Sequence, residues 1–287
     1  MRDRRTLLMV VLVAGVLLVT AGCGGSPGTN AAGAPVAAVS PTPNPAASPS
    51  PTPNPAASPS PTPSGSPANA TVLSDVEDSS KWLTCGACGN TGGTGAVAPY
   101  SFTVANLTPS EDGTSTQFAI AATVPYTNAY FYRQQTAIPQ QINALRYEFD
   151  LYIPVGMETA PQAIEFECQQ ILNGWVYNFS WQALYPGSVW RIFDYGLKRW
   201  DPTPIAFQHF TPGTWHHIVA EYHNDTTNHL VIHDALTVDG VRFPVGITHN
   251  AFFSGSTNQF TNAVQLDSNS TATAYNISVD KMTITYQ

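Results

Sequence analysis

Aromatic residues are confined to one part of this chain, and that division limits what can fold. The chain has 287 residues, and all 31 of its Trp, Tyr and Phe residues lie after position 80. Thirteen of the 24 prolines fall instead between Pro27 and Pro67. A segment poor in large side chains cannot bury enough surface to offset the entropy of ordering its backbone. The first 70 residues therefore cannot build a core, whereas residues 71–287 can form one domain of ordinary size.

The charge balance narrows the classes of partner. Eleven Lys and Arg residues stand against 19 Asp and Glu residues, so the net charge is −8, and charged residues make up only 10 % of the chain. A protein that binds nucleic acid by neutralising phosphates needs the opposite balance. Attraction to an anionic lipid surface also needs clustered basic residues. The sequence therefore excludes nucleic acid as a partner and disfavours direct binding to anionic lipid.

The N-terminus has the pattern of an export signal. Three arginines lie within the first five residues, and a short apolar stretch, 7–19, follows them. The next four residues, Thr20-Ala21-Gly22-Cys23, resemble a bacterial lipobox. The resemblance implies a lipoprotein signal peptide at 1–22, cleavage before Cys23 and lipidation of its thiol, which anchors a protein stably to a membrane. We then expect an exported protein on the bacterial cell envelope, at the outer membrane or the cell surface; the alternative is an ordinary secretory signal with an incidental Cys.

Residues 23–70 form a linker rich in Pro, Ser, Thr and Ala. The ten residues from Pro41 to Ser50 are repeated identically from Pro51 to Ser60, and residues 24–70 carry no charge. Such a segment has little to bury, so we expect disorder with the semi-stiff character of proline-rich chains. The segment is interpreted as a stalk. The alternative is a docking site for a proline-recognising partner.

Short stretches with alternating apolar side chains dominate residues 71–287. The clearest are 145–153 and 163–171, and similar ones occur at 176–183, 189–194, 216–223, 230–238 and 275–286. Asp239-Gly240 and Asn173-Gly174 each lie between two such stretches and indicate tight hairpins. No amphipathic helix of ten residues is evident. The pattern predicts an all-β fold of two packed antiparallel sheets, a sandwich or jelly roll.

Several segments resemble the concanavalin A-like lectin/glucanase superfamily, which includes laminin-G-like domains. They also resemble a group of uncharacterised secreted acidobacterial proteins within that superfamily. The matching segments are 82–89, 109–118, 125–132, 164–170, 190–194, 214–220 and 279–286. The resemblance covers nearly all of 71–287 and implies a jelly-roll domain that contacts glycans. It implies no particular activity.

Three cysteines remain after Cys23 is assigned to lipid. Outside the cytoplasm disulfides are expected, and three thiols allow one intramolecular bridge. We predict the bridge between Cys85 and Cys88, with Cys168 as a free thiol that packs like a small apolar residue. Zinc needs more ligands than this arrangement offers, so no metal site is predicted from the cysteines.

The strand at 163–171 carries the most distinctive chemistry. With a period of two, Glu165, Glu167 and Gln169 share one face, and the apolar side chains between them share the other. The apolar face belongs in the core, so we expect the acidic face to look outward into a sugar-sized groove. The laminarinase-type glucanases of the superfamily carry Glu-x-Asp-x-x-Glu on such a strand. Here Gln170 occupies the position of the acid, and Gln cannot titrate, so no catalytic residue is predicted.

A binding role requires only donors, acceptors and aromatic rings. The candidate set is Glu165, Glu167, Gln169, Gln182, Trp190 and Arg191. Alternatives remain open for each of them. The two acids fit equally a solvated face or one paired with Arg191, and Trp190 fits a core position.

The sequence gives little support for cofactors. Calcium is compatible with the superfamily, and Asp112 and Asp267 are interpreted as loop acids, but no calcium-binding run of the Asp-x-Asp-x-Asp type occurs. His216 and His217 are adjacent on a strand, so their rings face opposite sides and cannot share a metal. The favoured function is a lipid-anchored, non-catalytic carbohydrate-binding protein with a polysaccharide or glycan partner. The alternatives are a glycoside hydrolase or lyase, and an adhesion or structural protein of the envelope.

Overall fold

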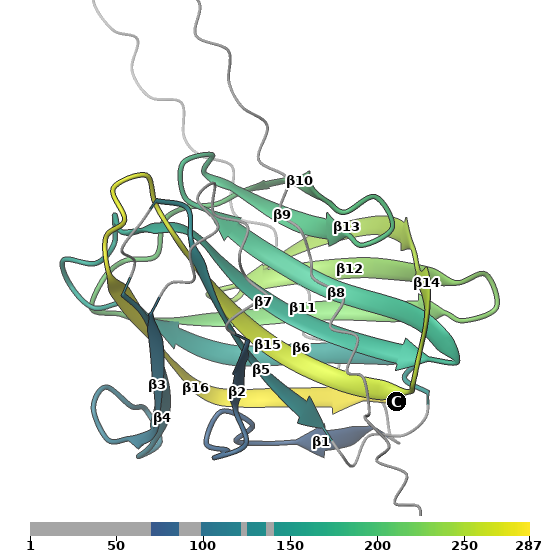
Figure 1. Cartoon of the computed structure of the whole chain (residues 1–287), viewed down its shortest axis with the longest axis horizontal. Helices are drawn as coiled ribbons and strands as arrows, with labels where there is room; N and C mark the ends of the chain where they lie inside the picture. The colour runs from purple at the N-terminus through teal and green to yellow at the C-terminus, as the bar shows by residue number, and fades with distance from the viewer. Residues whose placement is uncertain (1–69, 86–98, 122–124, 136–140) are drawn as a thin grey trace, which may run out of the picture.

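The computed structural model describes residues 70–85, 99–121, 125–135 and 141–287, and these form an antiparallel β-sandwich (Figure 1). The described residues lie in strands, turns and loops, and none of them lies in a helix. The predicted all-β, two-sheet jelly-roll sandwich is confirmed. No helix in the described part is long and apolar enough to cross a bilayer.

Sheet A is the rear layer in Figure 1. Its order is β13 (Val241–Asn250), β12 (Leu230–Val238), β11 (Trp215–Asp225), β6 (Ala144–Tyr152), β16 (Tyr275–Tyr286), β4 (Ser115–Ile120) and β3 (Tyr100–Asn106). The short strand β1 (Thr71–Leu73) also pairs with β16. The final strand of the described chain therefore lies inside this sheet, between β6 and β4.

Sheet B is the front layer. Its order is β10 (Arg199–Ala206), β9 (Val189–Asp194), β8 (Gly174–Leu184), β7 (Pro161–Leu172), β15 (Gln259–Ser268), β5 (Asn128–Gln135) and β2 (Leu83–Cys85). Strand β14 (Phe252–Ser256) pairs with the beginning of β8. The edge strands β10 and β13 of the two sheets contact each other.

Aromatic side chains from both sheets fill the core. Phe149 of sheet A packs on Phe166 of sheet B with ring centroids 4.4 Å apart, and Phe179 packs on Tyr222 at 4.9 Å. All four rings are buried. Removing such a ring typically costs about 3–5 kcal/mol, so these contacts hold the sheets together.

Both predicted hairpins are present. Asp239 and Gly240 have φ angles of 49° and 79° and connect β12 to β13, and Asn173 and Gly174 have φ angles of 51° and 82° between β7 and β8. Positive φ at both central residues is what a type I′ turn requires, and Asn, Asp and Gly tolerate it best.

The cysteine predictions have different outcomes. Cys168 is a free, buried thiol in the core, as predicted, and burial raises its pKa well above the ordinary value. Cys23 and Cys88 lie outside the described residues, as do the whole predicted signal peptide and the linker up to residue 69. Lipidation and the Cys85–Cys88 bridge therefore stay predictions.

Candidate functional site

The alternation on β7 directs its acidic side chains to the outer face of sheet B, the face turned away from sheet A. Ile164, Phe166 and Cys168 belong to the core. Strand β7 pairs with β8 from Ala163 to Leu172 without a bulge, so the period of two is unbroken. Glu165, Glu167 and Gln169 consequently share the outer face, as the pattern predicts.

Glu165 is held by its neighbours on β8 and β9. It lies opposite Gln182, whose Nε2 donates a hydrogen bond to Glu165 Oε1. The Nε of Arg191 donates in turn to Gln182 Oε1 at 2.7 Å. Arg191 is thus linked to Glu165 through the Gln182 amide, which gives the face a continuous row of polar contacts across three strands.

A third carboxyl group comes from β15. Asp267 was interpreted as a loop acid, but it lies within β15, where it pairs with Ala163 of β7. Its side chain is hydrogen-bonded to Glu165, which is also hydrogen-bonded to Glu167. Three carboxyl groups from two neighbouring strands therefore meet on one face.

Burial keeps protons on this cluster. Desolvation, followed by the charges of Asp267 and Glu167, raises the pKa of Glu165 well above its ordinary value. Desolvation also raises the pKa of Glu167 to about 7 and that of Asp267 to about 6. Carboxyl groups that share protons near neutral pH can both donate and accept hydrogen bonds.

The structure does not have the open groove that we expected around Glu165 and Glu167. Glu165 is 1 % exposed and Glu167 is 7 % exposed, because neighbouring side chains pack against them. Ser180 and Tyr130 are hydrogen-bonded to Glu167. Gln169 and Asp267 remain partly exposed, so the cluster meets solvent at these two side chains.

Aromatic rings border the cluster on two sides. Tyr130 and Tyr132 of β5 are stacked with centroids 5.8 Å apart. On the opposite side, the guanidinium of Arg191 lies 5.9 Å from the centroid of Trp200. Trp200 belongs to β10 and is partly exposed.

One sequence-based assignment needs correction. Trp190 was a predicted binding residue, but it is 2 % exposed and packs in the core against Phe207, with centroids 5.2 Å apart. Adjacent residues on a strand face opposite sides, so Trp190 cannot share a face with Arg191. Gln170, which occupies the position of the glucanase acid, likewise faces inward, where its Oε1 accepts a hydrogen bond from Ile142 N at 3.3 Å.

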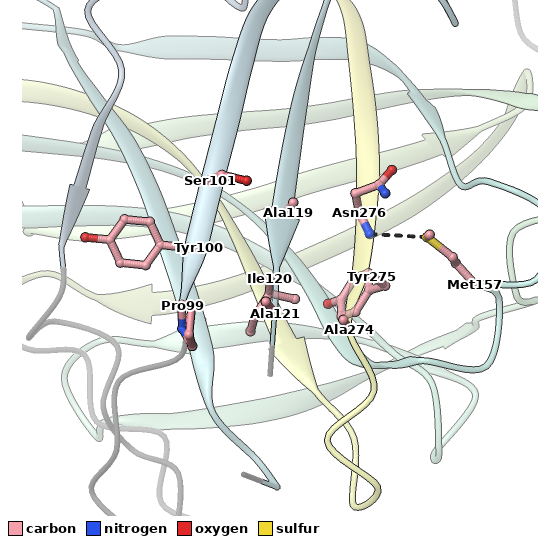
Figure 2. Close-up of a pocket in the computed structure, with 10 residues that line it drawn as sticks. All are labelled: Pro99, Tyr100, Ser101, Ala119, Ile120, Ala121, Met157, Ala274, Tyr275 and Asn276. Atoms are coloured by element: carbon pink, nitrogen blue, oxygen red, sulfur yellow. Dashed lines mark hydrogen bonds between the residues drawn. The ribbon is translucent and has the colours of Figure 1, made fainter. Parts of the chain in front are cut away.

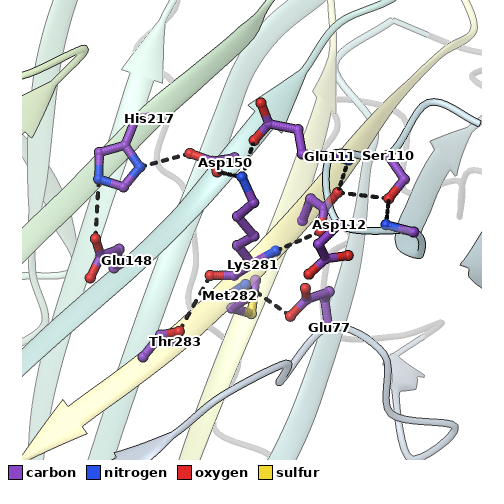
Figure 3. Close-up of polar contacts among 12 residues, drawn as sticks. Glu77, Ser110, Glu111, Asp112, Glu148, Asp150, His217, Lys281, Met282 and Thr283 are labelled. Atoms are coloured by element: carbon purple, nitrogen blue, oxygen red, sulfur yellow. Dashed lines mark hydrogen bonds and ion pairs between the residues drawn. The ribbon is translucent and has the colours of Figure 1, made fainter.

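A second polar network lies on the outer face of sheet A (Figure 3). His217 Nδ1 is 2.7 Å from Asp150 Oδ1, and its Nε2 is 3.1 Å from Glu148 Oε1. These hydrogen bonds raise the pKa of His217 to about 9, so the ring is charged at neutral pH. His216 contacts Asp239 instead, at 2.8 Å, in accord with the expected opposite orientation of the two rings. The His217 network is a set of mutually neutralised ion pairs that joins β6 to β11.

A pocket at the β3, β4 and β16 end of sheet A offers less chemistry (Figure 2). Its volume is about 270 Å³, and it is lined by Pro99, Tyr100, Ser101, Ala119, Ile120, Ala121, Met157, Ala274, Tyr275 and Asn276. None of these is an acid, a base or a histidine, so the carboxyl cluster of sheet B is the stronger candidate site.

Comparisons with known proteins give distant structural neighbours. No family model and no curated protein matches the sequence. A carbohydrate-binding module of the β-sandwich superfamily is 13 % identical with a TM-score of 0.38 over 70 % of this chain, which spans 56 % of that structure. The carbohydrate esterase vb_24B_21 from the Shiga toxin-encoding bacteriophage phi24B is 14 % identical with a TM-score of 0.44, over 76 % of this chain and 99 % of its own. Arcelin-5, a lectin-like defence protein from Phaseolus vulgaris, is 10 % identical with a TM-score of 0.41, over 77 % and 99 %. Because these similarities are low, the function has to be argued from the site itself.

Proposed function

We propose that the domain binds a polysaccharide on the outer face of sheet B and does not cleave it. The observation that carries the proposal is the hydrogen-bonded row from Arg191 through Gln182 and Glu165 to Asp267, bordered by aromatic rings. Guanidinium, amide and carboxyl groups supply the donors and acceptors that sugar hydroxyls need. Partly exposed rings such as Trp200 and Tyr132 offer flat apolar surfaces on which sugar rings can stack.

The arrangement of the carboxyl groups favours binding over hydrolysis. A retaining glycosidase keeps its two carboxyl groups about 5–5.5 Å apart, with one free to protonate the leaving oxygen. Glu165 is instead hydrogen-bonded to Asp267 and buried, so these two groups are too close and too enclosed to stand on either side of a glycosidic bond. They are better suited to orienting the polar side chains around them.

The proposal includes a place for the domain in the cell. Lipid on Cys23 would hold the protein on the bacterial envelope, and residues 24–70 would carry the domain away from it. An extended proline-rich chain of this length reaches up to about 140 Å at about 3.1 Å per residue. That reach would let the binding face contact polysaccharide beyond the membrane surface.

The binding proposal is tested with the full chain and a panel of polysaccharides in affinity electrophoresis and calorimetry. Trp200→Ala should weaken binding at least tenfold, because it removes the ring beside Arg191. Trp215→Ala is the matched control, since Trp215 packs against Tyr152 within the other sheet, and it should leave the affinity unchanged. Failure of the wild type to bind any polysaccharide at millimolar protein, or equal losses in the two variants, would contradict the proposal.

Asp267 also gives the hydrolase alternative a specific basis, because it supplies the third carboxyl group that Gln170 does not. Release of reducing sugar, or of unsaturated uronate absorbing at about 235 nm, from the same panel would support cleavage. Glu165→Gln should then abolish that release. Under the binding proposal the same variant should lose only about 1 kcal/mol of affinity, the scale of one hydrogen bond between uncharged groups, because Glu165 is buried and protonated.

A further inference from the structure

Two acids and a histidine meet where the edges of the two sheets come together, away from the carboxyl cluster on β7. Asp194 ends β9, Asp201 lies on β10 and His249 lies on β13. One potential ligand atom from each lies within 4.8 Å of the others, and no other group of three such residues does so among the described residues. Figure 1 shows the edge strands β10 and β13 close together at this end of the sandwich.

His249 lacks the hydrogen bonds that a buried imidazole normally makes. The residue is 9 % exposed, and its Nδ1 has no hydrogen-bond partner in the described structure. Its Nε2 lies 3.6 Å from Asp201 Oδ2, which is beyond hydrogen-bond distance. Nε2 is the nitrogen next to Asp201, and an ion bound between them would give this buried ring a partner.

The interior behind His249 offers no alternative partner. His233 of β12 lies there with its ring centroid 5.7 Å from that of His249, and it is fully buried. Neither ring nitrogen of His233 has a hydrogen-bond partner in the described structure. His249 is therefore oriented toward the two carboxylates on one side and a neutral, buried ring on the other.

The two carboxylates differ in their present partners. Asp194 is 8 % exposed, and its Oδ1 accepts a hydrogen bond from Leu197 N at 2.9 Å. Asp201 Oδ1 is 2.8 Å from Arg199 Nε, and its Oδ2 is 3.4 Å from Arg199 Nη2. The Arg199 side chain is 61 % exposed, so it can turn toward solvent when a cation takes its place.

We propose that Asp194, Asp201 and His249 bind a divalent transition-metal ion, with Zn²⁺ or Mn²⁺ as the fitting class. Two carboxylate oxygens and one imidazole nitrogen are a ligand set for these ions, whereas Ca²⁺ takes oxygen ligands. Ligand atoms about 2.1 Å from a tetrahedral metal stand about 3.4 Å apart, close to the observed 3.6 Å between His249 Nε2 and Asp201 Oδ2. Three protein ligands leave at least one position for water.

Such an ion would join the two sheets at one edge. Asp194 and Asp201 belong to sheet B and His249 to sheet A, so the ion would link strands that otherwise meet only through packing. A ligand that binds only the folded state stabilises it by mass action. The site does not depend on the proposed polysaccharide binding, and either proposal can fail without the other.

The test uses the full chain after treatment with a chelator. Calorimetry with Zn²⁺ and Mn²⁺ should show one tight site, and Zn²⁺ should raise the unfolding temperature by several degrees, whereas Ca²⁺ and Mg²⁺ should not. Co²⁺ as a spectroscopic probe should give a visible absorption band at one equivalent. Absence of a one-to-one site for these metals in the wild type would overturn the proposal without reference to any variant.

Variants then locate the site. His249→Gln and Asp194→Asn should each lose at least tenfold in Zn²⁺ affinity and lose the Co²⁺ band. Asp234→Asn is the matched control, because Asp234 pairs with His223 at 2.8 Å on the outer face of sheet A without a third ligand, and it should bind Zn²⁺ as the wild type does. Full Zn²⁺ affinity in a folded His249→Gln variant would overturn the assignment.

Discussion

Glu77 is an acidic side chain that the fold buries completely. It is 0 % exposed, its Oε2 accepts a hydrogen bond from Met282 N at 2.9 Å, and its Oε1 has no hydrogen-bond partner in the described structure. Desolvation raises the pKa of Glu77 to about 8, although its hydrogen bonds to backbone N–H groups act in the opposite direction. Folding therefore favours the protonated form of this carboxyl group.

The pH dependence follows from that raised pKa. Stability from Glu77 should be complete below the unfolded-state value near 4.5 and should fall as the pH rises through about 8. Between pH 5 and pH 9, the Glu77→Gln variant should lose a few kcal/mol less unfolding free energy than the wild type. Each unit of pKa shift corresponds to about 1.4 kcal/mol. Urea unfolding at the two pH values measures it. Glu158→Gln, in a surface turn, is the control; equal slopes in the wild type and the Glu77 variant would contradict the prediction.

Single residues also show what sequence patterns can and cannot provide. The period of two correctly separated Glu165 and Glu167 from the core side of β7, because a strand without bulges leaves no other choice. The period of two could not predict that Asp267 lies next to Glu165, because that contact depends on the register between strands about a hundred residues apart in sequence. The alternation of Gln265 and Asp267 indicates a strand, but it does not indicate that this strand pairs with β7.

At the scale of elements, the two hairpins with Asx-Gly turns place different demands on their glycines. A Cβ at Gly240 would meet nothing within 4 Å, whereas a Cβ at Gly174 would lie 2.8 Å from a ring carbon of Phe253. Both glycines have positive φ, which costs an L-residue about 1–2 kcal/mol. The difference between them is therefore one of packing.

Alanine at the two positions should separate these effects. Gly240→Ala should lower the free energy of unfolding by about 1–2 kcal/mol through backbone strain alone. Gly174→Ala should cost more, because Phe253 must also move. Chemical denaturation of the two variants at one pH measures the difference. A larger loss in Gly240→Ala than in Gly174→Ala would show that the Phe253 contact is unimportant.

Edge position explains why two of the strands, β10 and β13, are hard to recognise from the sequence. Strands such as β6, β7 and β11 lie inside sheets and alternate clearly, so their residues were predicted well. Strands β10 and β13 contain Pro202, Pro204 and Pro244, which argue against a strand. Both are the edge strands of their sheets, where proline removes no essential ladder hydrogen bond.

At the scale of the whole molecule, the proposed anchoring makes a prediction of its own. When the chain is expressed in a bacterium, the wild type should enter the detergent-rich phase of a phase-partition experiment, because its lipid chains favour an apolar environment. Cys23→Ser should move it to the aqueous phase. Thr20→Leu, which brings the segment closer to the usual lipobox, should behave like the wild type. Retention of the Cys23 variant in the detergent phase would contradict lipidation at this residue.

The central position of β16 in sheet A has a consequence for how the protein is made. Both neighbours of this strand, β6 and β4, and also β1, which pairs with its far end, are synthesised earlier. All residues up to Tyr286 must therefore be synthesised before sheet A can close. Until then sheet A exists only as two separate parts, β13-β12-β11-β6 and β4-β3, because β16 is the strand that joins them.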